Sequence, residues 1–198
     1  MVLEELVGIE TGLINWIIEL MHSLGGWGIL IGMFLESSII PIPSEAILVT
    51  AGAIGFSPWE VAFWGTIGST LGAMVGYYIG KVGGRPVVDK FGPYLLVTPD
   101  KVERAEKAFK KYGGMTVLVS RLIPFIPFKV FSITSGLLKF DFKTFIIFTF
   151  IGTIPRAFLL AWIGTEIVKY QQYFYFFIAG VIVAGLFAYY LNKKYKWF

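Results

Sequence analysis

Apolar residues fill most of the chain, and two of its apolar stretches are interrupted at their centres by prolines and charged residues. The first stretch, residues 25–56, carries Pro41 and Pro43 between Glu36 and Glu45. Each apolar arm beside this interruption has about half of the ~20 residues that a membrane-spanning helix needs. Proline lacks an amide proton and disfavours helix in the residue before it, so a continuous helix through this point is disfavoured. The pattern predicts a broken segment at membrane depth whose polar backbone faces the protein interior.

The second interrupted stretch, residues 113–138, mirrors the first. Its centre carries Pro124 and Pro127 and, where the first stretch has acids, Arg121 and Lys129. A shift of 84 residues pairs Pro43 with Pro127, Glu45 with Lys129, Gly52 with Gly136, Gly68 with Gly152 and Gly80 with Gly164. This self-similarity predicts an internal repeat, with repeat 1 at about residues 25–80 and repeat 2 at about residues 113–168.

Five further helices are predicted from the pattern. Each interrupted stretch leads into a transmembrane helix, at about residues 57–80 and 142–168, and a C-terminal transmembrane helix is expected at about residues 174–191. Apolar residues at helical spacing among acids predict an amphipathic or obliquely inserted helix over residues 1–24. The charged residues 98–112 predict a cytoplasmic surface helix.

A row of glycines marks the first of the predicted transmembrane helices. Its members recur every four residues and so share one helix face: Gly68, Gly72, Gly76 and Gly80. Such a face lets a neighbouring backbone approach closely. We expect it to pack within the chain against the repeat-related helix that contains Gly152 and Gly164, with dimerisation through this face as the alternative.

Composition narrows the class of protein. With 56% hydrophobic residues, 15% charged residues and a mean hydropathy of +0.72, the chain is expected to be an integral membrane protein with a single membrane domain, residues 1–198. Cysteine is absent and His22 is the only histidine. Neither a metal cluster nor a His-based phosphoryl-transfer site fits this inventory, so the sequence predicts no enzyme, no metal site and no cofactor.

Charges are distributed unevenly. All 17 Lys and Arg residues lie at or beyond Lys81, whereas residues 1–80 carry seven acids. The positive-inside rule places residues 81–111 and the C-terminus in the cytoplasm, in a multi-pass protein of the plasma membrane. The side of the N-terminus stays open. The bases border apolar spans and lack a recognition motif, so anionic lipid headgroups are their expected partners and nucleic acid is not.

The same rule predicts that both interrupted stretches are re-entrant hairpins with tips near mid-membrane. If the second stretch crossed the membrane, it would export Lys139 and Lys143. Re-entrance makes residues 57–80 run inwards and residues 142–168 run outwards, so the two repeats are inverted. The predicted fold class is therefore an all-α integral membrane protein with an inverted repeat of two re-entrant helical hairpins, each followed by a transmembrane helix, an architecture common among transporters.

Charged residues inside a membrane cost roughly 2.5–3.5 kcal/mol each, so those at the two breaks ask for an explanation. Arg121 and Lys129, with amide protons of a broken helix, are candidates to bind a phosphate headgroup whose tail stays in lipid. Glu36 and Glu45 are candidates to balance this charge or to titrate, which would couple the site to protons. Arg156 is a further candidate for the same cavity.

Structural interpretations compete with these roles. Glu45 would interact with the dipole at the start of a helix, Arg121 would extend to the cytoplasmic interface, and Arg156 would form an ion pair that packs two helices. A proton-coupled transporter of small cations would use the same carboxylates but leaves the bases unexplained. A membrane assembly role without transport stays open, as does homo-oligomerisation.

The motifs at the breaks resemble those of the DedA family, also called the SNARE-associated or VTT-domain family. The resemblance covers about residues 25–168. It rests on Glu36 followed by PIPSE, on the glycine-rich span from Gly72 to Gly80, and on SRLIPFIPF leading to Gly136. It implies a lipid transporter that moves polyprenyl phosphate carriers or scrambles phospholipids, with bacterial members linked to the proton motive force.

The resemblance also implies roles for individual residues. Glu36 and Glu45 correspond to the acids of the family's first hairpin, and Arg121 corresponds to the first of two arginines in its second hairpin. The chain departs from the bacterial pattern at the second arginine, which would fall at Pro127. Lys129 is then a displaced substitute for that arginine. The sequence FIPFK, residues 125–129, is closer to the divergent VTT branch of the family.

Overall fold

The computed structural model describes residues 12, 15–38, 43–91, 97–123 and 128–170. These residues form helices joined by short turns: a helix over residues 15–24, then α2 (Gly26–Ser38), α3 (Ser44–Ala53), α4 (Pro58–Phe91), α5 (Pro99–Tyr112), α6 (Met115–Leu122), α7 (Phe128–Leu137) and α8 (Phe142–Lys169). The all-α prediction is confirmed for this part of the chain. The expected C-terminal transmembrane helix and the breaks at Pro41, Pro124 and Pro127 lie outside the described residues.

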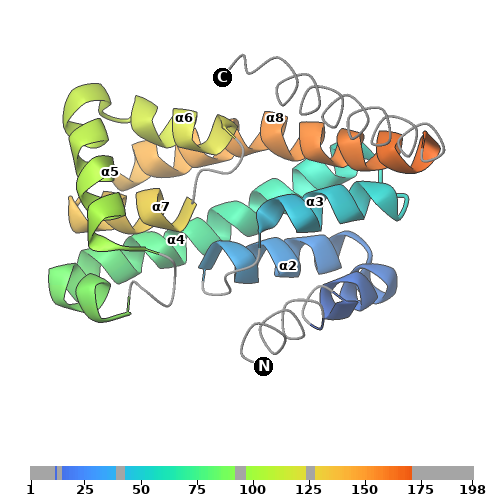
Figure 1. The fold of residues 1–198 in the computed structure, drawn as a ribbon, viewed down its shortest axis with the longest axis horizontal. Coiled ribbons are helices and arrows are strands. Elements are labelled where there is room, and N and C mark those ends of the chain that lie inside the picture. Colours follow the sequence, from blue (N-terminus) through green and yellow to red (C-terminus); the bar gives the residue numbers. More distant parts are fainter. Residues whose placement is uncertain (1–11, 13–14, 39–42, 92–96, 124–127, 171–198) are drawn as a thin grey trace, which may run out of the picture.

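Both predicted interruptions separate two short helices. The first lies between α2 and α3, where Pro43 is extended immediately before Ser44 starts α3, and the second lies between α6 and α7. In Figure 1, α3 turns back beside α2 and α7 turns back from α6, so each stretch forms a helical hairpin. The hairpins open towards opposite ends of the molecule, and the helix ends beside the two breaks, which we call the hairpin tips, lie near its middle.

The turns that end α3 and α7 use the same hydrogen bonds at positions 84 residues apart. The amide of Phe56 donates to the Ala51 carbonyl at 3.1 Å, and the amide of Phe140 donates to the Ser135 carbonyl at 2.9 Å. Both turns pass through a positive φ, which is 107° at Gly55 and 50° at the equivalent Lys139. The repeat in the sequence is thus matched by a repeat in local backbone structure.

The two long helices α4 and α8 each contact both hairpins. Along α4, Gly68 and Gly72 pack on α2 and Gly76 and Gly80 pack on α7; along α8, Gly152 packs on α6 and Gly164 packs on α3. A Cβ at Gly72 would lie 2.6 Å from the Phe34 carbonyl oxygen, and one at Gly76 would lie 3.0 Å from Ser132 Cβ. Side chains at these positions would therefore collide with a neighbouring helix.

The glycine row is intramolecular, as expected, but the expected partner is wrong. The row contacts α2 and α7 and not the glycines of α8, which contact α6 and α3. The reason is that the closest approaches to the glycines of α4 and α8 are made by the backbones of the short hairpin helices.

Only α8, among the described helices, is long and apolar enough to cross a membrane by length and composition. It exposes Ile147, Ile151 and Trp162, which suits a surface in contact with hydrocarbon. The membrane span predicted at residues 57–80 is less apolar than α8, because much of α4 is Gly, Ser and Thr on faces that pack on the hairpins. The α4 helix also continues past Gly80 to Phe91, with a break at Gly84, where φ is 61°.

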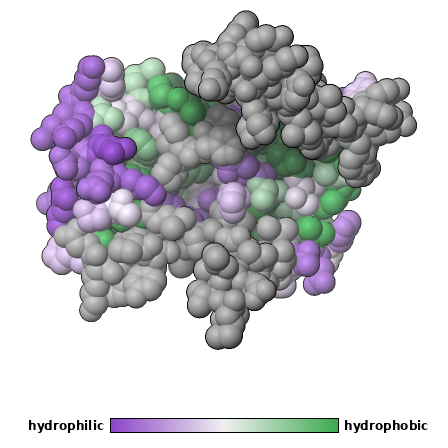
Figure 2. Space-filling model, viewed as in Figure 1, coloured by the Kyte–Doolittle hydropathy of each residue, from purple (hydrophilic) through white to green (hydrophobic). Residues whose placement is uncertain are grey.

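The surface helix α5 closes one end of the molecule. It buries Val102, Ala105 and Phe109 and pairs Glu103 with Lys107 at 2.7 Å on its outer side. Figure 2 shows hydrophilic residues gathered over this end. The surface helix predicted over residues 98–112 is therefore confirmed as α5.

Candidate anion site between the hairpin tips

Buried polar side chains gather where the two hairpin tips meet the middles of α4 and α8. They come from four parts of the chain: Glu36, Ser37 and Ser44 from the first hairpin, Arg121, Lys129 and Ser132 from the second, Ser69 from α4 and Arg156 from α8. Such groups are costly to bury unless each finds a partner. Their partners therefore indicate what the site can bind.

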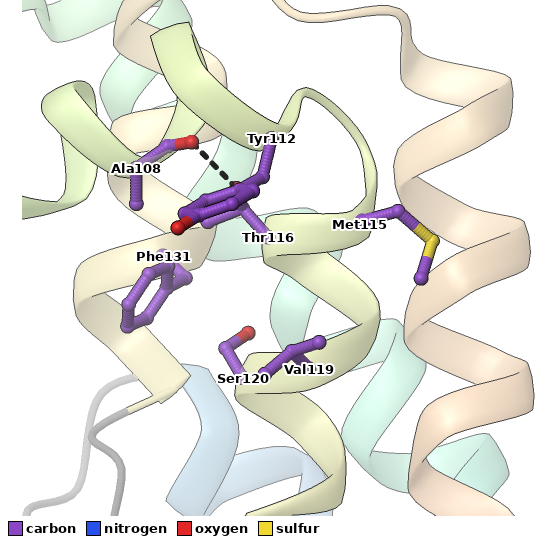
Figure 3. A pocket seen from close by; sticks show the side chains of 7 residues that line it. All are labelled: Ala108, Tyr112, Met115, Thr116, Val119, Ser120 and Phe131. Atoms are coloured by element: carbon purple, nitrogen blue, oxygen red, sulfur yellow. Dashed lines mark hydrogen bonds between the residues drawn. The ribbon is translucent and has the colours of Figure 1, made fainter.

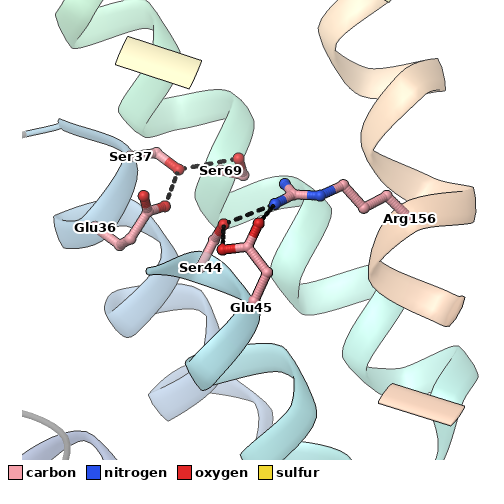
Figure 4. A network of polar contacts seen from close by, with 6 residues as sticks. All are labelled: Glu36, Ser37, Ser44, Glu45, Ser69 and Arg156. Carbon is pink, nitrogen blue, oxygen red and sulfur yellow. Dashed lines mark hydrogen bonds and ion pairs between the residues drawn. The ribbon is translucent and has the colours of Figure 1, made fainter. Parts of the chain in front are cut away.

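The first acid is held by hydroxyl groups (Figure 4). Ser37 Oγ donates to Glu36 Oε2 at 2.9 Å and lies 3.0 Å from Ser69 Oγ. This chain of contacts ties the end of α2 to the middle of α4. The charge of Lys129, which is buried at the start of α7, also acts on Glu36.

The second acid forms an ion pair with α8. Arg156 Nη2 donates to Glu45 Oε1 and, at 3.0 Å, to Ser44 Oγ (Figure 4). The Arg156 side chain is 1% exposed and that of Glu45 is 19% exposed. The structural alternative for Arg156, an ion pair that packs two helices, is thus present. Its Nε and Nη1 nevertheless have no acceptor among the described residues.

Arg121 is completely buried, and its hydrogen bonds go to uncharged groups of α7. Its Nη1 donates to the Phe128 carbonyl at 3.2 Å and its Nη2 donates to Ser132 Oγ at 2.7 Å. No carboxylate of the described residues lies within ion-pair distance, and Nε has no acceptor there. The alternative in which Arg121 extends to the interface is therefore wrong, because its side chain points into the protein.

The ring of Phe128 joins the two arginines. Its centroid lies 4.7 Å from Arg121 Cζ and 4.1 Å from Arg156 Cζ, within the range of cation–π attraction. Sequence reasoning missed Phe128 and the hydroxyls of Ser37 and Ser132. The 84-residue shift offered one signal, because it places Ser37 opposite Arg121.

An apolar groove of about 470 Å³ lies between α5, α6 and α7 (Figure 3). Its walls are almost entirely apolar and are formed by Ala108, Tyr112, Met115, Thr116, Val119, Ser120 and Phe131. Ser120 directly precedes Arg121, and Phe131 directly precedes Ser132. The groove and the buried cation thus share a stretch of α6 and of α7.

A family model described as the VTT domain matches residues 42–166, a range that includes Glu45, Arg121, Lys129 and Arg156. The chain belongs to the VTT-domain family. This is the family that the motifs at the two breaks resemble, so the resemblance to DedA proteins is confirmed.

Several known proteins are similar to this chain over most of their length. The chain is 32% identical to the uncharacterized membrane protein YkoX of Bacillus subtilis, over 96% of this chain and 88% of that one. It is 35% identical to undecaprenyl phosphate transporter A of the same organism, over 78% of each chain. It is also 32% identical to an alkaline phosphatase-like protein of Lactococcus lactis, over 76% of this chain and 74% of that one. No solved structure matches. This VTT-domain protein is accordingly a membrane protein.

Proposed function

We propose that this protein transports a phosphate-bearing lipid across the membrane, with the headgroup passing through the site between the hairpin tips. The observation that carries the proposal is Arg121, a fully buried cation without a carboxylate in ion-pair distance among the described residues. The similarity to undecaprenyl phosphate transporter A supports a lipid that bears a phosphate.

A phosphate would complete the hydrogen bonding of this site. An uncompensated buried charge is strongly destabilising, and an incoming anion relieves that cost. The unpartnered N–H groups of Arg121 and Arg156 are donors of the kind that bind phosphate oxygens through charge-assisted hydrogen bonds. A lipid chain beside the headgroup would meet the apolar wall of the groove at Ser120 and Phe131.

The architecture that we propose is an inverted repeat in which the hairpins enter the membrane from opposite sides. Two contacts whose residues are related by the 84-residue shift support it. Gly52 packs on the Ala161 carbonyl and Gly136 on the Tyr77 carbonyl, so each short helix packs on the long helix of the other repeat. In this arrangement residues 1–198 form one membrane domain, and the end that carries α5 faces the cytoplasm with the C-terminus.

The carboxylates supply a route to proton coupling. While Glu45 is ionised it occupies Nη2 of Arg156. Protonation of Glu45 would remove the ion pair and leave Arg156 to the phosphate, whereas Glu36 would respond to the charge of Lys129 beside it. An amide cannot release a proton, so Glu45→Gln and Glu36→Gln should flatten the dependence of transport on pH. A pH dependence identical to that of the wild type would exclude proton coupling through these acids.

The test is translocation by the purified protein in liposomes. The assay compares a labelled polyprenyl phosphate with a labelled zwitterionic phospholipid, and also follows phosphate release. Arg121→Ala should slow transport of the polyprenyl phosphate about tenfold to a hundredfold, the effect of losing one charge-assisted contact. If Arg121→Ala moves both lipids at the wild-type rate, the phosphate site is not there.

Two other functions are outcomes of the same assay. Transport of a small cation would use Glu36 and Glu45, but Glu45 already pairs with Arg156, and a cation would be repelled by Arg121. An enzymatic role, for which the name of the Lactococcus relative is the reason to look, predicts phosphate release. If the protein neither transports a lipid nor releases phosphate, the result would favour an assembly role.

A further inference from the structure

We propose that Phe128 is a positioning residue that holds the guanidinium groups of Arg121 and Arg156 together as one pair for a single phosphate. The inference rests on the proposed function, because that phosphate is the headgroup of the transported lipid. Phe128 ends the motif SRLIPFIPF, but the motif assigns it no role, and the role follows from where the fold places its ring.

One buried ring serves cations from two helices. Arg121 stands at the end of α6 and Arg156 stands in the middle of α8, yet both have their Cζ atoms within 5 Å of the Phe128 centroid. Phe128 is 5% exposed. Attraction between a cation and a ring is stronger when both are removed from water.

Two guanidinium groups this close repel each other, and the repulsion is larger in a medium of low dielectric constant. Glu45 offsets it on the side of Arg156, but a carboxylate also occupies the donors that a phosphate needs. The face of an aromatic ring is neutral and binds the flat face of a guanidinium, so it leaves the in-plane N–H groups available. Nε of both arginines and Nη1 of Arg156 lack acceptors among the residues described.

The side chain of Phe128 can be changed without changing its hydrogen bonds. These bonds use its backbone carbonyl, which accepts from Arg121 Nη1 at 3.2 Å and from Ser132 Oγ at 3.1 Å. An effect of substituting the ring therefore reports on the ring and not on the end of the hairpin.

The experiment replaces Phe128 with phenylalanines that carry one, two and three ring fluorines. Fluorine withdraws electron density from the ring face and leaves the shape nearly unchanged. Binding of inorganic phosphate and of hexyl phosphate is measured with the purified full chain in nanodiscs of zwitterionic lipid. The dissociation constant should rise stepwise, by about fivefold to thirtyfold at three fluorines, which corresponds to about 1–2 kcal/mol for two contacts.

Conventional variants extend the series. Phe128→Tyr keeps an aromatic face and should bind phosphate within about twofold of the wild type, whereas Phe128→Leu should bind as weakly as the trifluoro variant. The matched control is Phe109→Leu, another buried phenylalanine, in α5, which contacts no cation among the described residues. It should leave phosphate binding unchanged. Thermal unfolding of each variant shows that the protein is folded.

The outcomes separate the two proposals. If the wild type binds neither phosphate, the proposed function and this inference both fall. If the wild type binds, Arg121→Gln does not bind, and fluorination has no effect on the dissociation constant, the phosphate site stands and the positioning role of Phe128 is overturned.

Discussion

The two hairpins share a backbone and differ in charge. Both break near the middle of the molecule, both end in the same hydrogen-bonded turn, and both pack on a long helix through glycine, α3 on α8 and α7 on α4. The tip of the first carries Glu36 and Glu45, and the tip of the second carries Arg121 and Lys129. Features that recur in both halves thus serve packing, and features that differ form the site.

The difference also accounts for how the tips meet. Two tips with like charges would repel each other at low dielectric constant, whereas tips of opposite charge attract. The first hairpin has two carboxylates, while the second hairpin and α8 together supply three cations. Counted as formal charges, one positive charge is in excess among these five side chains.

The largest effect is expected where the hairpins are alike. Gly80 packs on the Ile133 carbonyl, and its equivalent Gly164 packs on the Val49 carbonyl. Leucine at either position would force the helices apart and destabilise the protein by about 3 kcal/mol or more. Folded yield in detergent should fall equally for Gly80→Leu and Gly164→Leu. Gly12→Leu, at a glycine with open space around it, is the control. A monomer that stays intact in either variant would contradict the packing.

The next effect concerns the ion pair between the halves. Arg156→Glu places two acids together in a buried site and should cost about 3 kcal/mol, the low end for a broken buried pair because Glu45 is partly exposed. The double variant Glu45→Arg with Arg156→Glu restores opposite charges. Its thermal midpoint should recover most of the loss. If the double variant is as unstable as Arg156→Glu, the pair does not hold α3 to α8.

A smaller effect is expected at the turn that ends each hairpin. Lys139 has a φ of 50°, a region that glycine adopts without strain and that Gly55 occupies in the first hairpin. Lys139→Gly should therefore stabilise the protein by about 0.5–1 kcal/mol. The reverse change, Gly55→Lys, should destabilise it. Thermal unfolding of both variants measures the difference, and a fall in midpoint for Lys139→Gly would refute it.

The smallest effect is expected at the N-terminal caps of the two long helices, which are a hydroxyl in one and a carboxylate in the other. Ser57 Oγ accepts from the Glu60 amide before α4, and at the equivalent position Asp141 accepts from the Thr144 hydroxyl and amide before α8. The pKa of Asp141 is lowered from its usual 3.8 by these two hydrogen bonds. The bond from the Thr144 hydroxyl has the larger effect and the bond from its amide the smaller one. The ionised cap therefore contributes stability above pH 3.8 that is lost as the pH falls through the lowered value. Asp141→Ser should remove this acid-dependent loss and leave the cap. An unchanged acid profile would show that the Asp141 carboxylate does not contribute.

Local features of the fold were predictable from the sequence and long-range contacts were not. Proline pairs predicted both breaks, and the charge pattern of residues 98–112 predicted α5, because each signal acts within a few residues. The prediction of which helix packs on the glycine row was wrong, because a glycine face permits a close neighbour but does not specify which one. The pairing of Arg156 with Glu45, 111 residues away, and the sharing of Phe128 by two arginines depend on how whole hairpins dock.

The glycine contacts have a mechanical consequence. Helices that pack through side chains interlock, because ridges on one surface fit grooves on the other, and sliding requires the ridges to climb out. At Gly68, Gly72, Gly80, Gly152 and Gly164 the hairpin backbones rest on surfaces without ridges. A hairpin that slid along its long helix would have few interlocked side chains to repack at these glycines, which is the condition for the shear type of motion.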